Sequence, residues 1–442
     1  MGATPPVYRA AVRLASGLAP ALALLSPKLA AGHRGRHGSA ERLAAWGSRH
    51  RDLRRPLIWL HASSVGEGLQ AESVLLELRR RRPGAQYVYT HFSPSAESLA
   101  GRLPVDAADY LPYDLPRTVE SLLQALAPDL LVFAKLDLWP ELAVRAAAHG
   151  TRVAMVAATV SPGSGRLRWP VRSLLRPGYA AVCAAAAVAD GDADRLARLG
   201  VSPDRIRVLG DPRCDSVVDR IAEIAPDEPL LGFGRGAPTL VAGSTWPGDE
   251  SVLLRSFARV LPSHPAARLI LVPHEPTEPH LLEAERAAAG LGLPVPVRLS
   301  RAREAVPLLL VDRVGVLAAL YGAGTMAYVG GGFGRAGLHS VLEPAAWGLP
   351  VAFGPQWRES RDAADLLEVR GGRALTARGA AAVGEMVGIW CEWIEREEER
   401  RAAGGRSRAL VERGRGAAAR SAELLAELTS SPRPRTSPSG AR

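Results

Sequence analysis

The chain has 442 residues, of which 47% are hydrophobic and 5% aromatic, and its formal net charge is +10 at pH 7. This length exceeds the size at which a single hydrophobic core stops growing, so we expect two domains of roughly 150–200 residues, and the apolar content excludes a disordered chain. Three cysteines, Cys183, Cys214 and Cys391, follow no disulfide or metal-ligand spacing, which fits a reducing cytosol and supports neither a disulfide framework nor a zinc site.

The positive charge suits nucleic acid, an anionic membrane or a phosphorylated substrate, because all three favour a positive surface potential. Arginines cluster at residues 34–55 and 79–82. No stacking aromatic side chains alternate with them as a single-strand binder requires, so we expect no nucleic acid partner.

The amino-terminal residues 8–31 are largely apolar. Their uncharged run at 14–25 is shorter than the roughly 20 residues that cross a bilayer, and no small-residue cleavage site precedes the basic run at 33–36. Two alternatives remain for residues 1–32: a monotopic helix on the cytoplasmic face of a membrane, held by its apolar side and nearby arginines, or a helix docked on the next domain. We favour the membrane-associated helix.

From residue 57 onward, short β-type runs alternate with longer helical patterns, which predicts right-handed βαβ units and parallel sheets. A stretch rich in proline, glycine and charge at 225–238 interrupts this alternation and predicts an interdomain linker. The expected strands are 57–61, 86–90, 130–133, 152–157, 181–184 and 206–209 before this linker, and 239–242, 268–272, 308–311, 326–329 and 350–353 after it.

The predicted fold class is α/β, with two Rossmann-like, doubly wound parallel-sheet domains that face a cleft. Ligands of such sheets bind at the carboxyl ends of the strands. The helices at 380–428 either pack back on the first domain or mediate association. The predicted order is the helix at 1–32, a domain at 33–224, the linker, a domain at 239–428 and a disordered tail at 429–442.

The first candidate site follows the first strand in the motif HASSVGEG, residues 61–68. Small residues there let a substrate approach the backbone, and the helix that follows begins with free N–H groups. Glu67 is the only carboxylate of this turn. It is either a general base, which needs partial desolvation, or an acid placed in the first turn of a helix, where the dipole favours it.

Two further motifs place charged residues after strands. FAKLDLWPEL, residues 133–142, carries Lys135 and Asp137 on one side of a strand, where they face a ligand together or, as we favour, form an ion pair. LGDPRCD, residues 209–215, offers Arg213 as a phosphate or carboxylate clamp near the domain boundary.

In the second domain, GGGFGRAGLHSVLEPAAWG at 330–348 joins a glycine cluster to a predicted helix beginning over 339–343. Backbone amides there would hold a phosphate, and the carboxylate of Glu343 would bind a ribose diol. Glycine clusters also occur in tightly packed turns, so this second interpretation stays open.

The motifs of this chain, taken in order, resemble those of the Kdo (3-deoxy-octulosonate) transferases of lipopolysaccharide synthesis. They are GHRGRHG, HASSVGE, LPYDLP, LDLWP, LGDPRCD, AGSTWPGDE, VPHEP and GGGFG…LEPAAWG…FGP. The resemblance implies the two-Rossmann-domain glycosyltransferase architecture called GT-B and transfer of Kdo from CMP-Kdo to the lipid A precursor lipid IVA. It also implies a location at the cytoplasmic face of the bacterial inner membrane, as a monotopic protein or through a single amino-terminal anchor. CMP-Kdo is a donor substrate, so no cofactor is implied.

The resemblance assigns roles residue by residue. Glu67 matches the base that deprotonates the acceptor hydroxyl, and Lys135 and Arg213 fall where transition-state stabilisers lie. The implied reaction is a direct displacement with inversion, in which positive charge and helix-end amides stabilise the leaving phosphate without a metal ion. Segments that hold CMP contain Pro273, His274, Val314, Gly315, Val316, Ser340, Val341, Leu342 and Glu343.

The chain departs from the common family pattern at Lys135, His274, Val316 and Ser340, where many members carry glutamate, arginine, an acid and asparagine. Two alternatives therefore remain. One is another GT-B transferase that uses a UDP-sugar on a lipid acceptor, and the other is a membrane-associated paralogue without activity.

Overall fold

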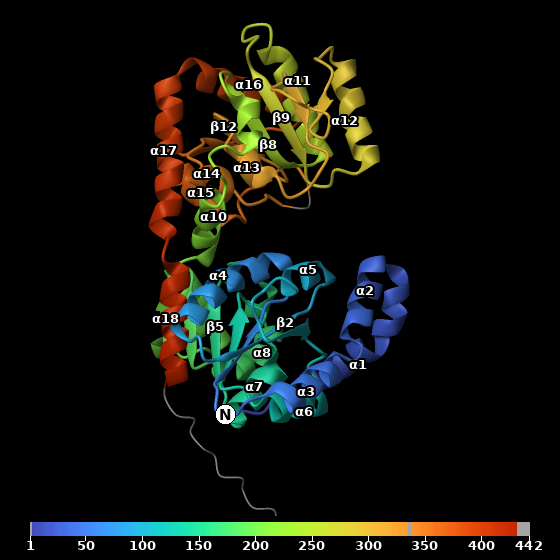
Figure 1. The fold of residues 1–442 in the computed structure, drawn as a ribbon, viewed down its shortest axis with the longest axis vertical. Helices are drawn as coiled ribbons and strands as arrows, with labels where there is room; N and C mark the ends of the chain where they lie inside the picture. The colour runs from blue at the N-terminus through green and yellow to red at the C-terminus, as the bar shows by residue number, and fades with distance from the viewer. Residues whose placement is uncertain (1, 335–336, 431–442) are drawn as a thin grey trace, which may run out of the picture. The chain divides into compact units, whose positions relative to one another are not determined.

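The computed structural model describes residues 2–334 and 337–430. The chain forms two compact units, here called unit 1 (Met1–Ser216 and Arg415–Arg442) and unit 2 (Val217–Gly414) (Figure 1). Unit 2 thus begins before the predicted linker, because helix α10 (Pro212–Ala222) runs through the boundary. Residues 431–442 of the predicted disordered tail lie outside the described residues.

Unit 1 contains a seven-stranded parallel sheet with strand order β3-β2-β1-β4-β5-β6-β7. Most of its strands are buried along their length, as expected when helices cover both faces of a parallel sheet. The strands are β1 (Leu57–His61), β2 (Gln86–His91), β3 (Ala107–Tyr110), β4 (Leu130–Ala134), β5 (Arg152–Ala158), β6 (Ala184–Ala187) and β7 (Ile206–Val208).

Two strands of this sheet differ from the prediction. The strand expected at 181–184 is β6 at Ala184–Ala187, because the alanine-rich run around it has no alternation that fixes a boundary. Strand β3 was not expected, since it is a partly exposed edge strand with the sequence AADY and no apolar run.

The helices of unit 1 include the last helix of the chain, α18 (Ala417–Ser430). Its Ala418, Ala422 and Leu425 join the same core cluster as Val74 of α4, so this helix packs back on unit 1. The others are α3 (Ser39–His50), α4 (Val65–Arg81), α5 (Glu97–Ala100), α6 (Pro116–Leu126), α7 (Pro140–Ala148), α8 (Val171–Ala180) and α9 (Asp190–Leu199).

Unit 2 repeats the architecture, with a seven-stranded parallel sheet ordered β10-β11-β9-β8-β12-β13-β14. The strands are β8 (Thr239–Thr245), β9 (Arg268–Pro273), β10 (Val297–Arg298), β11 (Leu308–Leu310), β12 (Met326–Val329), β13 (Val351–Phe353) and β14 (Gly372–Ala374). The two edge strands, β10 and β14, were not predicted, because two or three residues carry no periodic signal.

The helices of unit 2 are α11 (Pro247–Val260), α12 (Glu278–Gly290), α13 (Leu317–Tyr321), α14 (Leu342–Ala346), α15 (Arg361–Glu368), α16 (Gly379–Glu395) and α17 (Glu397–Gly414). Together the two units confirm the predicted α/β class with two doubly wound parallel sheets.

The amino-terminal segment is two helices and not the single helix predicted for 1–32. Helix α1 (Pro6–Leu22) passes through a short 3₁₀ turn, Ala23–Leu25, into α2 (Pro27–Arg36). Ser26 is extended because the ring of Pro27 disfavours a helical conformation in the residue before it. Within the described residues, no helix combines the length and the apolar character that crossing a bilayer requires.

Polar contacts at its first turn attach α1 to unit 1. Tyr8 donates a 2.8 Å hydrogen bond to buried Asp114, and Arg9 pairs with Glu141 at 2.8 Å. The apolar side chains of this segment remain exposed: Leu14 by 66%, Leu24 by 88% and Leu25 by 75%. The segment is therefore docked through polar groups, while its leucines have no apolar surface of unit 1 to cover them.

Candidate active site

The strand order of unit 1 places two loops of charged residues at the point where the sheet reverses direction. β1 and β4 are neighbours, and the chain continues from β1 toward one edge and from β4 toward the other. In doubly wound sheets this switch point is where ligands bind. The loop after β1 carries Glu67, and the loop after β4 carries Lys135 and Asp137.

Glu67 lies in the first turn of α4 and is half-buried. The N-cap residue Ser64 accepts a hydrogen bond from the Glu67 amide, and one carboxylate oxygen of Glu67 accepts from the Ser63 amide at 3.0 Å. Burial raises the pKa of Glu67, and the negative charge of Asp137 raises it further, whereas Lys135 lowers it. Glu67 therefore combines both predicted features, a place in the helix start and the desolvation that a general base needs.

Lys135 does not lie on the strand, as the alternation argument assumed, because β4 ends at Ala134. Its φ of +58° is the left-handed conformation that an L-residue adopts at a cost of about 1 kcal/mol, and its amide donates to the Val156 carbonyl. The predicted ion pair with Asp137 is wrong: among the described residues the Lys135 ammonium forms no ion pair, and it acts on Glu67 through its charge.

Asp137 instead ends a chain of buried hydrogen bonds. Its Oδ2 lies 3.1 Å from His61 Nε2 and accepts from Trp139 Nε1 at 3.3 Å, while His61 Nδ1 lies 3.0 Å from the Thr90 hydroxyl. The Thr90 hydroxyl also accepts from Trp59 Nε1, and Trp139 Nε1 lies 3.1 Å from His61 Nε2, so one network joins the ends of β1 and β2 to the loop after β4. Burial acts to raise the pKa of Asp137, but the contacts with His61, Arg166 and Trp139 hold it below its usual value.

The sequence argument missed His61 and the aromatic surface beside it. Phe92 lies 5.0 Å from Trp139 between ring centroids, and the Arg36 guanidinium lies 3.6 Å above the Phe92 ring. A signal for His61 was present, since it is the one ionisable residue of the fully buried strand β1. Phe92 and Arg36 gave none, because only the fold brings α2 to the loop after β2.

Arg213 lies in helix α10, which follows β7 at the edge of the sheet. Strand β7 is three strands from β4, a separation of about 14 Å across the sheet. The Arg213 guanidinium makes bidentate contacts with Asp211, at 2.9 and 2.7 Å. To bind a phosphate as predicted, the Arg213 guanidinium must therefore either release the Asp211 carboxylate or contact the carboxylate and the phosphate together.

Unit 2 has its own switch point between β8 and β12. The glycine cluster after β12 is packed so tightly that side chains are excluded: a Cβ on Gly330 would lie 2.2 Å from the Ser244 carbonyl oxygen. The Gly330 amide donates to Gly243, and the Gly331 amide donates to Asp249. These two amides are used inside the fold and do not serve the predicted phosphate contact.

Asp249 joins the elements that flank this switch point. It is fully buried, and its carboxylate accepts hydrogen bonds from the Gly331 amide at 2.9 Å, the Trp246 amide at 3.0 Å and the Tyr328 hydroxyl at 2.8 Å. One side chain thus fixes the glycine loop, the start of α11 and the end of β12. The motif AGSTWPGDE contained Asp249, but nothing in its spacing indicated this role.

An aromatic cluster lies at the carboxyl ends of β8 and β9. The ring centroids of His274 and His339 are 4.3 Å apart, and Trp246 Nε1 donates to His339 Nε2 at 3.0 Å. Burial and the neighbouring His274 lower the pKa of His339 to about 4, so its ring stays neutral and accepts this bond. His339 precedes the helix that was predicted to begin over 339–343, because α14 starts only at Leu342.

The remaining predicted CMP contacts follow β9, β11 and β12 of the same sheet. Glu343 is held by Arg220 at 2.6 Å, and burial raises its pKa while Arg220 lowers it. Ser340 is exposed, Val341 and Leu342 are buried, and Val316 caps α13. Pro273 ends β9, while Val314 and Gly315 lie exposed in the loop after β11, where Gly315 has a φ of +86°.

Comparison with known proteins adds independent evidence. Residues 37–216 match the family model described as 3-deoxy-D-manno-octulosonic-acid transferase (kdotransferase). The transferase of that name from Bordetella pertussis is 29% identical over 321 residues, which cover 70% of this chain and 73% of that protein. Its Aquifex aeolicus counterpart is 26% identical, with 71% and 80% covered. Over residues 37–216 the chain thus matches the Kdo transferase family, and two relatives of that name match about 70% of it. The protein is a glycosyltransferase.

Solved structures of low identity show the same fold. The UDP-GlcNAc 2-epimerase from Neisseria meningitidis superposes with a TM-score of 0.61 at 11% identity, covering 84% of this chain and 99% of that one. A glycosyltransferase from Rickettsia africae superposes with a TM-score of 0.57 at 11% identity, covering 86% and 100%. The GT-B architecture predicted for a Kdo transferase is thereby confirmed.

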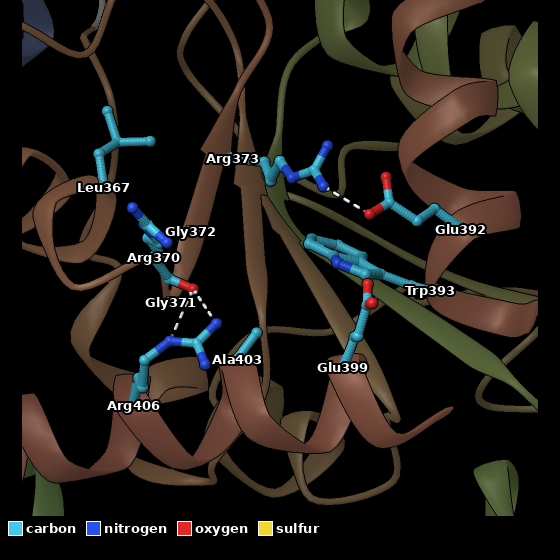
Figure 2. Close-up of a pocket in the computed structure, with 10 residues that line it drawn as sticks. All are labelled: Leu367, Arg370, Gly371, Gly372, Arg373, Glu392, Trp393, Glu399, Ala403 and Arg406. Atoms are coloured by element: carbon cyan, nitrogen blue, oxygen red, sulfur yellow. Dashed lines mark hydrogen bonds and ion pairs between the residues drawn. The ribbon is translucent and has the colours of Figure 1, made fainter. Parts of the chain in front are cut away.

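A separate pocket lies at the edge strand β14 of unit 2, with a volume of about 250 Å³ (Figure 2). Its polar groups are engaged with one another: Arg406 donates to the Arg370 carbonyl, and Arg373 pairs with Glu392 at 2.7 Å. None of the predicted site residues lines it, and we assign it no part in transfer.

Proposed function

We propose that the protein transfers Kdo from CMP-Kdo to the lipid A precursor lipid IVA, with inversion at the anomeric carbon. The observation that carries the proposal is Glu67, a half-buried carboxylate with a raised pKa at the switch point of unit 1. A carboxylate in this state is suited to accept a proton from a sugar hydroxyl.

In the proposed reaction, a Glu67 oxygen removes the proton of the acceptor hydroxyl as its oxygen attacks the anomeric carbon of Kdo. The bond from that carbon to the phosphate oxygen breaks, and CMP leaves with the electron pair. The Lys135 charge stabilises the carboxylate form of Glu67 before the step, and the network from Thr90 through His61 fixes the neighbouring Asp137.

We assign CMP to unit 2, which carries the groups that suit a nucleotide. The exposed His274 ring, stacked on His339, offers a flat surface for a base. Arg220 contacts one carboxylate oxygen of Glu343, and the second oxygen would accept from a ribose hydroxyl. If the donor is a CMP-sugar, CMP raises the melting temperature and UDP does not; the same response to UDP alone would favour a UDP-sugar transferase.

The pH dependence of transfer follows from the charges around Glu67. Because Asp137 raises and Lys135 lowers the pKa of Glu67, Lys135→Met moves the acid limb of kcat/KM to higher pH, and Asp137→Asn moves it to lower pH. Arg117→Met is the control, since it removes a positive charge at an exposed residue of α6, and it leaves the acid limb at the wild-type pH. Measured pH profiles that move in the same direction for both site variants would contradict the role of Glu67 as base.

The exposed leucines of α1 and the following turn support attachment to the membrane surface. We propose that they insert at the interface while the polar contacts of Tyr8 and Arg9 hold the segment on unit 1. Leu14→Asp combined with Leu18→Asp then weakens binding to anionic vesicles by at least about tenfold, because two apolar side chains are lost from the interface. Val295→Asp, at an 85% exposed position of unit 2, is the matched control. Equal vesicle binding by all three proteins would rule out this attachment.

A further inference from the structure

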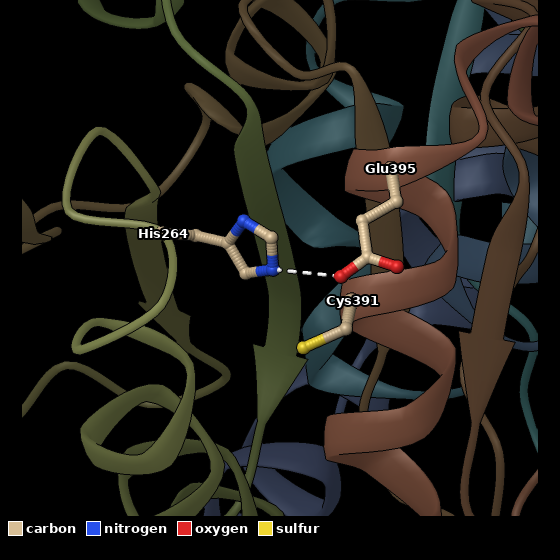
Figure 3. Close-up of side chains that lie close together, drawn as sticks. All are labelled: His264, Cys391 and Glu395. Atoms are coloured by element: carbon tan, nitrogen blue, oxygen red, sulfur yellow. Dashed lines mark ion pairs between the residues drawn. The ribbon is translucent and has the colours of Figure 1, made fainter.

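Three side chains with metal-binding atoms meet on unit 2, away from every residue assigned above. His264 lies in the loop between α11 and β9, and Cys391 and Glu395 lie one turn apart near the end of α16. Figure 3 shows the imidazole, the thiol and the carboxylate directed toward one another. The fold brings together residues that are distant in sequence, which is why spacing gave no sign of a metal site.

The separations fit a single metal ion. The ligand atoms of the three residues all lie within 4.8 Å of one another, and His264 Nε2 is 3.2 Å from Glu395 Oε1. A tetrahedral ion with bonds of about 2.0–2.3 Å separates its ligand atoms by about 3.3–3.7 Å.

The state of His264 favours an ion over a simple ion pair. Its Nε2 is buried and, among the described residues, has no hydrogen-bond partner, although Glu395 Oε1 is only 3.2 Å away. A buried ring nitrogen is normally satisfied. A metal ion between His264 Nε2 and Glu395 Oε1 would accept the lone pair of the nitrogen. It would also explain why these two atoms lie close together without a hydrogen bond.

The ligand types select the metal. Thiolate, imidazole and carboxylate together are ligands of Zn²⁺, whereas Mg²⁺ and Ca²⁺ take oxygen ligands only. We propose that His264, Cys391 and Glu395 form a Zn²⁺ site, with water as the fourth ligand. The site joins the α11–β9 loop to α16, which already packs on α11 through the stacked rings of Phe257 and Trp390.

The position places this ion away from the proposed nucleotide contacts. His264 precedes β9, whereas Pro273 ends this strand and His274 follows it, and the six residues of the strand span roughly 20 Å. The Zn²⁺ site and the proposed nucleotide contacts thus lie at opposite ends of the same strand. Zinc stabilises unit 2 without taking part in transfer, so its test is independent of the proposed reaction.

The test is titration of the metal-free full chain with Zn²⁺ against a chromophoric chelator, together with Co²⁺ substitution. We expect one tight equivalent per chain, a higher melting temperature with Zn²⁺, and a thiolate-to-cobalt charge-transfer absorption. Cys391→Ala and His264→Ala weaken Zn²⁺ binding by at least about 100-fold, since even outer contacts of a metal site change affinity 10–100-fold. Cys183→Ala, at the half-buried cysteine of unit 1, leaves binding and the absorption unchanged.

Glu395→Gln keeps the experiment decisive if the other variants unfold, because this side chain is 61% exposed and its loss does not disturb the core. It weakens Zn²⁺ binding while preserving the melting temperature of the metal-free protein. The proposal is overturned if the wild type binds no Zn²⁺ in competition with the chelator, or if Cys391→Ala and Glu395→Gln bind it as tightly as the wild type.

Discussion

Replacing Glu67 by glutamine lowers the rate of transfer by about 10²–10⁴-fold, the contribution that a positioned general base makes to catalysis. Glutamine has the size of glutamate and still accepts the hydrogen bond from the Ser63 amide, so α4 keeps its first turn. The loss falls on kcat and leaves CMP binding unchanged, because the proposed nucleotide contacts lie in unit 2. Initial rates and CMP titration of the same preparation separate these effects.

Glu77→Gln is the matched control, since Glu77 lies on the same helix and pairs with the exposed Arg80. It leaves transfer and stability at wild-type levels. If Glu67→Gln kept its activity within a few-fold, the residue would serve only the start of α4, and the proton acceptor would have to be sought elsewhere.

Replacing Asp249 by alanine destabilises unit 2 by about 3 kcal/mol or more, because three buried donors lose their acceptor together. The melting temperature of unit 2 then falls by roughly 6–12 °C. CMP binding falls as well, since Asp249 holds the glycine loop and Trp246, which bonds His339 of the proposed base-stacking surface. Calorimetry and CMP titration measure the two effects.

Asp227→Ala, at an exposed position of unit 2, controls for the loss of one carboxylate. Its melting temperature and CMP affinity stay at the wild-type values. A change of less than about 1 kcal/mol in Asp249→Ala would mean that the loop is held by the glycine contacts alone.

The sheet interiors were predictable because buried parallel strands are continuous apolar runs. Strand β1 matches the predicted 57–61, and β9 at Arg268–Pro273 matches the predicted 268–272 to within one residue. Short edge strands such as β10 and the alanine run of β6 carry too little pattern to be placed. The break before Pro27 was overlooked because the leucines on both sides read as one apolar segment.

The candidate site was predictable only where a motif follows a strand directly, as Glu67 does. The electrostatic partners of Glu67 were not predictable, since the Asp137–His61 contact joins the loop after β4 to the end of β1, which lie far apart in the chain. Lys135 was assigned to the strand because alternation was extended past the end of β4, and its left-handed backbone leaves no trace in the sequence. Asp249 belongs to a recognised motif, but its buried contacts depend on β12.

The most direct test of the proposed function is incubation of the full chain with CMP-Kdo, generated in situ, and tetraacylated lipid IVA, with the products analysed by mass spectrometry. We predict lipid IVA carrying added Kdo and an equal amount of released CMP with the wild type, and neither product above background with Glu67→Gln. Two results would contradict the proposal: lipid IVA that stays unmodified although the folded protein binds CMP, or transfer that occurs only from a UDP-sugar.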